Sequence, residues 1–284
     1  MKKTRVLRNF WYSLTANQRF LIRRVYYFPI DLWDKLTGKT NKYVPSRGLI
    51  YTGSPASAEK YIEQGLMQLN TLKKEINLQP NDSVLDIGSG VGRTAIALTT
   101  CIDKTGSYDG FDVVKEGVDW CNARLGKDYP NFKFKYVSIF NDLYNKSLVK
   151  TAEFKFPYDD NCFSKVISFS LFTHMQISEI QHYFFEIQRV LKPDGLCLST
   201  FFLYNDEEED YVSSNADFAF PYKKDNYRLM NQNVKSGNIA IHKDKIKSML
   251  KNANLECVKI SDGFWKNDDN TTKEYQDIVI FKKI

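Results

Sequence analysis

A strand, a set of spaced glycines and a helix start follow one another directly between residues 83 and 94. Val84 to Ile87 is a short apolar run, typical of a buried strand in a parallel sheet. Three glycines at alternate positions from Gly88 then allow a sharp turn and a close backbone approach to a ligand. Helical sequence begins at Thr94. This order predicts a nucleotide-type site at the carboxyl end of a sheet strand.

The spacing of the glycines argues against a dinucleotide. When Gly88 is counted as position one, the dinucleotide fingerprint needs Gly or Ala at position six, and Arg93 stands there. Asp86 lies two residues before the first glycine, where its carboxylate can attract a cation or an ammonium group. The segment therefore indicates another kind of nucleotide site. An ordinary turn of an α/β domain is the structural alternative.

Composition and cysteine spacing set further bounds. The chain has 284 residues, of which 43% are hydrophobic, enough for one large α/β domain with additions. The chain contains no run of about 18 apolar residues, so we expect no membrane span, and we also expect no signal peptide. The five cysteines show no C-x-x-C spacing, so we expect reduced thiols in a cytoplasmic protein. No spacing typical of metal ligands occurs, so we expect no metal.

The net charge of +6 is unevenly placed. Residues 1–50 contain 11 Lys and Arg against 2 Asp and Glu, which leaves 29 basic and 32 acidic residues in the rest. The positive excess therefore belongs to the N-terminal arm, residues 1–50. This distribution argues against a nucleic-acid surface across the whole protein.

The arm has the pattern of a helix. Leu21, Val25, Phe28 and Leu32 recur at helical spacing, arginines and aromatic residues accompany them, and Pro29 is expected to divide the region into two short helices. A basic, aromatic, amphipathic arm can lie on an anionic membrane surface, and residues 1–40 are the candidate contact. The alternatives are that the arm packs on the core or that it meets nucleic acid.

Alternating strands and helices fill residues 51–284, the expected main domain. Expected strands are 84–87, 107–112, 132–137, 164–170, 196–203, 255–261 and 275–281, and expected helices are 56–76, 92–102, 113–125, 178–191 and 243–253. The second strand ends in Asp112, 26 residues after Asp86. A carboxylate at that tip can accept both hydrogen bonds of a ribose diol, although such an Asp can also be a helix cap.

Other strand ends supply further candidates. Ser138 can offer a hydrogen bond to an adenine, and Ile139 or Phe140 can form an apolar wall. His174 follows the fourth strand, where an imidazole near half-protonation at neutral pH suits a general base. The alternative is that His174 packs in the next helix.

Two segments are expected to cover the site. Tyr51 and Gly53 lie in a Pro/Gly-rich passage before the first helix of the domain and are candidates for a lid, with a plain connector as the alternative. Residues 204–240 interrupt the alternation after the fifth strand, and we expect this insertion to cover the substrate, with Tyr204 at its start. Phe172, beyond the fourth strand, is a further substrate candidate.

Four stretches together resemble one family. They are Val84-Leu85-Asp86-Ile87-Gly88-Ser89-Gly90-Val91-Gly92-Arg93, Gly110-Phe111-Asp112, Phe156-Pro157-Tyr158 to Phe172-Thr173-His174-Met175, and Val190-Leu191-Lys192-Pro193-Asp194-Gly195. Their order from residue 51 onward is similar to that of the class I S-adenosylmethionine-dependent methyltransferases, and to an uncharacterised bacterial subgroup acting on small molecules or glycans. The resemblance implies an α/β, Rossmann-like, seven-stranded and mostly parallel sheet in the order 3-2-1-4-5-7-6, with helices on both faces and one antiparallel strand.

The resemblance also implies a cofactor, S-adenosylmethionine, and a set of residues to hold it. That set comprises Asp86, Gly88, Ser89, Gly90, Arg93, Asp112, Val113, Ser138, Ile139, Phe140, Ser170 and Leu171. Two positions depart from the pattern. Ser138 stands where many relatives place an acid for the adenine amino group, and Ser164 stands where relatives often have Asp. The first departure weakens the expected recognition of adenine.

The expected reaction is transfer of the sulfonium methyl group to oxygen of a sugar, a glycan or a small metabolite. Oxygen is favoured over nitrogen because Ser170-Leu171-Phe172-Thr173 stands where an Asn/Asp-Pro-Pro-Tyr motif would recognise an amide. Two alternatives remain open. One is an RNA or protein methyltransferase that the basic arm anchors, and the other is an inactive scaffold of the same fold at a membrane.

Overall fold

The computed structural model describes residues 11, 14–51, 56–141, 145, 147–215, 218–234, 236–266 and 274–284. The chain divides into two compact units. The first comprises residues 1–73, 79–81 and 89–148, and the second comprises residues 74–78, 82–88 and 149–284.

Seven strands pair in the order β10-β11-β5-β4-β1-β2-β3. Numbered along the chain within this sheet, the order is 3-2-1-4-5-7-6, so the expected topology is confirmed. The pairs β1–β4, β4–β5 and β2–β3 are parallel. The last strand, β11, runs antiparallel to both of its neighbours, as the resemblance implied.

The first unit contains the N-terminal helix and two strands. Its elements are α2 (Ala16–Leu36), most of α3 (Ala58–Ile76), α4 (Arg93–Leu98), β2 (Ser107–Asp112), α5 (Lys115–Cys121) with a π-helical turn at Asn122–Gly126, and β3 (Phe132–Tyr136). Alternation in β3 buries Phe132 and Phe134 and leaves Lys133 exposed. The Phe132 ring stacks on Tyr108 of β2 with 5.1 Å between ring centroids. This aromatic pair forms the core beside β2.

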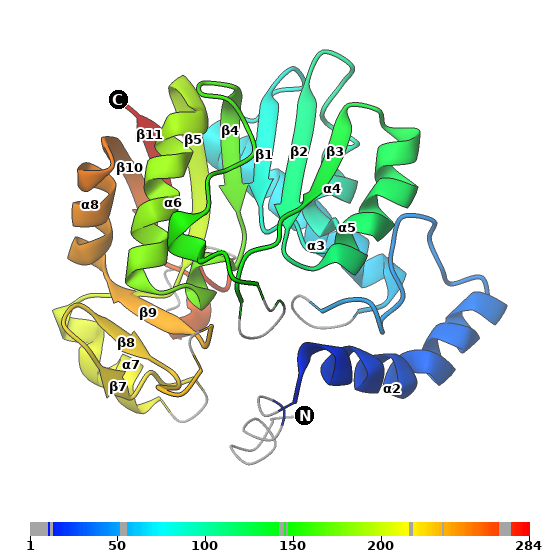
Figure 1. The fold of residues 1–284 in the computed structure, drawn as a ribbon, viewed down its shortest axis with the longest axis horizontal. Coiled ribbons are helices and arrows are strands. Elements are labelled where there is room, and N and C mark those ends of the chain that lie inside the picture. Colours follow the sequence, from blue (N-terminus) through cyan, green and yellow to red (C-terminus); the bar gives the residue numbers. More distant parts are fainter. Residues whose placement is uncertain are drawn as a thin grey trace. The chain divides into compact units, whose positions relative to one another are not determined.

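The second unit contains the other sheet strands. They are β1 (Ser83–Ile87), β4 (Phe163–Ser168), β5 (Leu191–Phe201), β10 (Leu255–Ser261) and β11 (Asp277–Lys283). Figure 1 shows α6 (Ile177–Val190) and α8 (Lys243–Asn252) running beside these strands. In α6, the buried residues Ile180, Phe184 and Ile187 recur at helical spacing, because one face of the helix packs on the sheet.

The expected insertion, 204–240, contributes to a second, smaller sheet. Its order is β6 (Leu203–Tyr204), β9 (Ile239–His242), β8 (Tyr227–Leu229) and β7 (Tyr222–Lys223), and α7 (Glu209–Ser214) lies beside it (Figure 1). An aromatic cluster forms its core, where Phe202 meets Trp265 and Phe220 at centroid distances of 5.0 and 5.6 Å. This sheet follows directly from the carboxyl end of β5.

Two expectations about elements are wrong. Pro29 does not divide the arm, because α2 continues through it from Ala16 to Leu36. A capping box of Thr15 and Gln18 holds one end of α2, and Asp31 and Asp34 fix the other end to Arg47. These contacts offset the hydrogen bond that proline cannot make.

The expected fifth strand, 196–203, is really two strands. It begins earlier, at Leu191, and leaves the large sheet after Phe201. Leu203 donates its amide to the Asp277 carboxylate and starts the small sheet. The change of direction therefore depends on a side chain more than 70 residues away, which no local pattern indicates.

Candidate active site

The turn after β1 has the conformation that its glycines predict. Gly88, Gly90 and Gly92 have φ of +78°, +59° and +78°, a region that other residues rarely adopt. At Gly88 a Cβ atom would lie 3.2 Å from Leu171 Cδ1. Leu171, one of the expected cofactor residues, therefore packs directly on this turn.

In the first unit, the Asp112 carboxylate beside the glycine turn accepts several hydrogen bonds. Its Oδ2 accepts the Gly90 amide at 2.9 Å, and its Oδ1 accepts the Val114 amide at 2.9 Å and the Tyr51 hydroxyl at 3.1 Å. Only 8% of the residue is exposed. The structure thus brings together three residues that the sequence singled out: Asp112, Gly90 and Tyr51.

The surroundings of Asp112 perturb its protonation. Burial raises the pKa of the Asp112 carboxyl above its ordinary value, while the hydrogen bonds from the Val114, Gly90 and Val113 amides and from Tyr51 oppose that rise. Each donor stabilises the charged form. A ligand that donated hydroxyl hydrogens to this carboxylate would therefore favour its ionised state further.

The end of β3 lies beside this carboxylate. The Val137 amide donates to the Asp112 carbonyl at 3.1 Å. Beyond it, Ser138 is exposed, Ile139 is buried and Phe140 is 38% exposed. The Ser138 carbonyl accepts a hydrogen bond from the Ser147 hydroxyl at 2.8 Å. The segment predicted to meet adenine therefore follows directly after a residue that is bonded to the backbone of Asp112, and its contact with adenine stays a prediction.

Three other expected cofactor residues of the first unit make different contacts. The Arg93 guanidinium lies 5.5 Å from the Tyr61 ring centroid and donates to Gln64 at 3.3 Å, so it packs on α3. Ser89 is buried and donates its amide to the Phe111 carbonyl at 3.1 Å. Val113, next to Asp112, is half-buried. These geometries favour structural contacts for Arg93 and Ser89.

A polar cluster follows β4 in the second unit. Ser170 has a φ of +58°, an unusual conformation for a residue with a side chain. Its amide donates to Thr200 Oγ1 at 2.7 Å, and its hydroxyl donates to Gln276 Oε1 at 2.8 Å. Thr200 also donates to Gln276 at 2.7 Å. Backbone strain held in place by surrounding hydrogen bonds is typical of functional loops.

Sequence reasoning found Ser170 but missed Thr200 and Gln276. Thr200 is a polar residue at the end of an otherwise apolar strand, which was a usable signal. Gln276 directly precedes β11, and nothing in its local sequence indicates that it reaches Ser170. The antiparallel pairing of β11 with β5 brings the two strand ends together.

His174 lies in a 3₁₀ turn, Phe172–His174, and is half-buried. Its Nδ1 is 3.0 Å from the Ser236 carbonyl oxygen. A carbonyl can only accept, so Nδ1 carries the proton and donates, which leaves Nε2 as the accepting nitrogen of the neutral ring. The insertion therefore orients the imidazole that the sequence predicted as a base.

Residues 84–195 match a family model described as a methyltransferase domain. The match begins at Val84 of β1 and ends at Gly195 of β5, so it contains the glycine turn, Asp112 and the cluster after β4. Residues 84–195 form a methyltransferase domain. Methyltransferases of this fold use S-adenosylmethionine, and this domain contains a buried carboxylate, Asp112, beside a left-handed glycine turn.

Individual relatives of the methyltransferase domain are distant. The chain is 26% identical over 187 residues to a phosphoethanolamine N-methyltransferase of Plasmodium falciparum, and the alignment spans 63% of this chain and 63% of that protein. The chain therefore covers less than two thirds of the length of this curated relative.

Solved structures confirm the fold. A geranyl diphosphate C-methyltransferase of Streptomyces coelicolor, in a complex with S-adenosyl-L-homocysteine, is 13% identical with a TM-score of 0.51 over 80% of each chain. The [4+2]-cyclase SpnF is 15% identical with a TM-score of 0.51, over 95% of this chain and 96% of its own. The second neighbour is named for a reaction other than methyl transfer, so the fold alone does not fix the chemistry.

The remaining expected residues of the methyltransferase domain and its insertion are mostly buried. Asp86 is 3% exposed on β1. Phe172 is fully buried and stacks on Phe201 at 5.1 Å. Tyr204 is 3% exposed within the core of the small sheet, so its surroundings favour packing over substrate contact. Gly53 lies outside the described residues.

The described residues contain neither a metal-binding cluster nor a helix that could span a membrane. No group of three or more His, Cys, Asp or Glu side chains in that part of the chain could hold a metal ion. None of the helices described there is both long enough and apolar enough to cross a membrane.

Proposed function

We propose that this protein transfers the methyl group of S-adenosylmethionine to a small polar acceptor, with a hydroxyl oxygen of a sugar, glycan or metabolite as the first candidate. The observation that carries the proposal is the buried Asp112 carboxylate, which holds the Gly90 amide of a left-handed glycine turn. A carboxylate tied to such a turn suits the ribose of an adenosyl group.

The hydrogen-bonding capacity of Asp112 fits this role. A carboxylate offers about four acceptor positions, and the Gly90, Val114 and Val113 amides and the Tyr51 hydroxyl all donate to Asp112. The amides are fixed by the backbone, whereas the Tyr51 hydroxyl belongs to a side chain. A ribose diol could therefore bind Asp112 by displacing the Tyr51 hydroxyl.

The cofactor and the protein supply different parts of the reaction. S-adenosylmethionine supplies a methyl group already activated as part of a sulfonium. The protein has to align the acceptor and remove its proton, and orientation alone can contribute about 7–11 kcal/mol. For a hydroxyl acceptor, Nε2 of His174 would accept the hydroxyl proton. The Ser236 carbonyl holds the tautomer that this step needs.

The nature of the acceptor is argued from the sequence and the relatives. The Plasmodium protein and the Streptomyces protein are both named for small-molecule acceptors. The absence of an amide-recognising motif after β4 favours oxygen, whereas the Plasmodium protein is named for nitrogen. An assay of this proposal therefore offers hydroxyl and amine acceptors side by side.

The test combines binding and turnover. Calorimetry with S-adenosylhomocysteine should show micromolar binding to the wild-type protein and a loss of about 100-fold in Asp112→Ala, since two ribose hydrogen bonds to a buried charge disappear. With a radiolabelled methyl donor and a panel of hydroxyl acceptors, His174→Gln should lower kcat by about 100-fold or more with little change in KM, because the base is lost.

Asp109→Asn on the same strand is the matched control and should bind S-adenosylhomocysteine like the wild type. A wild-type protein that failed to bind S-adenosylhomocysteine at millimolar concentration would sink the proposal. Binding of S-adenosylhomocysteine without methyl transfer to any acceptor would favour the inactive scaffold. Transfer to amines alone would exclude oxygen as the acceptor.

A further inference from the structure

Helix α2 has its apolar side facing outward. Nine large apolar or aromatic side chains of this helix are exposed, with exposed fractions from 42% to 74%. They are Leu21, Ile22, Val25, Tyr26, Phe28, Ile30, Leu32, Trp33 and Leu36. At 100° per residue most of them share one broad side of the helix. The stripe of Leu21, Val25, Phe28 and Leu32 therefore does not pack on the core.

The side of α2 that faces the protein is charged. Arg19 is buried, and Arg23, Asp31 and Asp34 are half-buried. Asp31 accepts the backbone amides of Arg47 and Gly48 at 3.0 and 3.2 Å, and Asp34 forms an ion pair with Arg47. These polar contacts, together with an edge-to-face contact between the Phe20 and Tyr51 rings at 5.8 Å, attach the helix to the protein. Its exposed apolar side is left for another partner.

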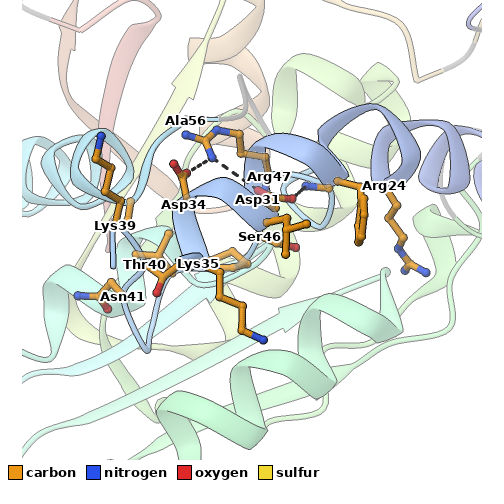
Figure 2. Close-up of a pocket in the computed structure, with 16 residues that line it drawn as sticks. Arg24, Asp31, Asp34, Lys35, Lys39, Thr40, Asn41, Ser46, Arg47 and Ala56 are labelled. Atoms are coloured by element: carbon orange, nitrogen blue, oxygen red, sulfur yellow. Dashed lines mark hydrogen bonds and ion pairs between the residues drawn. The ribbon is translucent and has the colours of Figure 1, made fainter. Parts of the chain in front are cut away.

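The charges nearest the apolar side are mostly basic, although Arg24 there forms an ion pair with Glu116. Both acidic residues of α2, Asp31 and Asp34, are engaged with the loop at Arg47, so they add no negative charge to the exposed side. A cavity of about 560 Å³ lies against this helix, and Lys35 and Lys39 at its wall point away from the Arg47 cluster (Figure 2). Among the described residues, no carboxylate lies within ion-pairing distance of these two lysines. The position of Lys35 on the helix wheel borders Phe28 and Leu21.

We infer that α2 lies in the plane of an anionic lipid bilayer, with its exposed apolar side in the boundary between headgroups and acyl chains. Basic residues that flank an apolar helix face are attracted to anionic headgroups, by about 1 kcal/mol each near the surface. Trp33 and Tyr26 each combine an apolar ring with a polar tip, which suits that boundary. A helix of 21 residues is about 30 Å long and can lie flat on a membrane.

The charge of the N-terminal arm also favours a bilayer over a second copy of the chain as the partner of α2. Residues 1–50 carry 11 Lys and Arg against 2 Asp and Glu, so two such arms would repel each other in a dimer. An anionic surface attracts the same charge. The bilayer is therefore the partner that satisfies both the apolar side and the basic excess.

The experiment is co-sedimentation of the full chain with phosphatidylcholine vesicles, with or without about 30% phosphatidylglycerol. The wild type should bind the anionic vesicles, and salt should weaken that binding. The double variant Val25→Asp/Leu32→Asp should lose at least about tenfold in partitioning, because two charges would enter the apolar layer. Lys35→Gln/Lys39→Gln should bind more weakly at low salt than the wild type and about equally at high salt.

The control is Leu148→Asp/Val258→Asp, which places the same substitutions at exposed positions outside α2 and should bind like the wild type. Circular dichroism checks that every variant is folded. On binding, the emission of Trp33, isolated by comparison with Trp33→Phe, should shift to the blue. The inference is overturned if the wild type ignores anionic vesicles at low salt or if Val25→Asp/Leu32→Asp binds like the wild type. It is equally overturned if sedimentation shows a dimer through α2 that excludes vesicle binding.

Discussion

Three buried carboxylates, Asp112, Asp277 and Glu186, each accept backbone amides from distant segments of the chain. Asp112 holds the glycine turn, and Glu186 accepts the Phe156 amide at 2.6 Å while pairing with Arg189. Burial works against the charge of Glu186, but Arg189 and the Phe156 amide outweigh it and lower the pKa of that carboxyl. The pKa of each carboxyl therefore depends on how far its hydrogen-bond donors and charged neighbours offset the effect of burial.

Asp277 shows the opposite balance. It accepts the Gly263 amide at 2.8 Å, the Trp265 indole at 2.7 Å and the Leu203 amide, and it joins the large sheet to the small one. Burial nevertheless raises the pKa of Asp277 to about 6. The folded protein therefore binds this proton more tightly than the unfolded chain does.

This raised pKa predicts a pH dependence of stability. The contribution of Asp277 to the free energy of unfolding is complete below about pH 4 and is lost as pH rises through about 6, by about 3 kcal/mol in total. Asp277→Asn removes this titration, so the difference in unfolding free energy between variant and wild type should change by about that amount between pH 4 and 7. Urea denaturation across this range measures it, with exposed Asp244→Asn as the control. A constant difference at every pH would contradict the raised pKa.

Helix packing in the first unit depends on one close approach between elements. Gly65 of α3 faces α4, and a Cβ atom there would lie 2.6 Å from the Arg93 carbonyl oxygen and 3.4 Å from Ala97 Cβ. The backbone of α4 cannot retreat easily, because it continues directly from the glycine turn. The short distance between the two helices therefore requires glycine at this position.

Gly65→Ala should destabilise the protein by about 2 kcal/mol or more, although alanine is the better helix former by about 1 kcal/mol. Gly38→Ala is the control, since Gly38 has a φ of +68° but open space around it, and it should cost only about 1 kcal/mol. Thermal and urea unfolding of both variants give the comparison. Equal losses would mean that backbone conformation, and not the contact with α4, sets the cost at Gly65.

The whole molecule combines a methyltransferase domain with a basic N-terminal helix and an inserted small sheet. The two additions differ in how they attach. The small sheet has its own aromatic core and is joined to the large sheet through Asp277, whereas α2 is attached mainly through charged and polar side chains and one ring contact, Phe20 to Tyr51. Additions of this kind leave the sheet order of the domain unchanged.

Cofactor binding should stabilise the protein as a whole. A ligand at 100 times its Kd adds about 2.7 kcal/mol to the free energy of unfolding, which corresponds to a rise in Tm of roughly 5–10 °C for a domain of this size. S-adenosylhomocysteine should produce this rise in the wild type and a much smaller one in Asp112→Ala at the same concentration. Differential scanning calorimetry measures both. An equal rise in the two proteins would show that Asp112 does not hold the ligand.

The sequence by itself determined the type and order of the elements, the glycine turn and the acid at the end of β2. Those features depend on local patterns, namely apolar periodicity, glycine spacing and the last residue of a strand, which a reader can see without coordinates. The same reasoning named Tyr51 without its bond to Asp112, and expected Arg93 at the cofactor although its guanidinium packs on Tyr61.

Only the tertiary structure decided three further matters. It joined Ser170, Thr200 and Gln276, turned the chain into the small sheet at Asp277, and showed which side of α2 is exposed. Each depends on contacts between residues far apart in the sequence. The periodicity of α2 is the same whether its apolar side faces the core or the solvent, so only the position of its charged side against Arg47 and its neighbours could settle the direction.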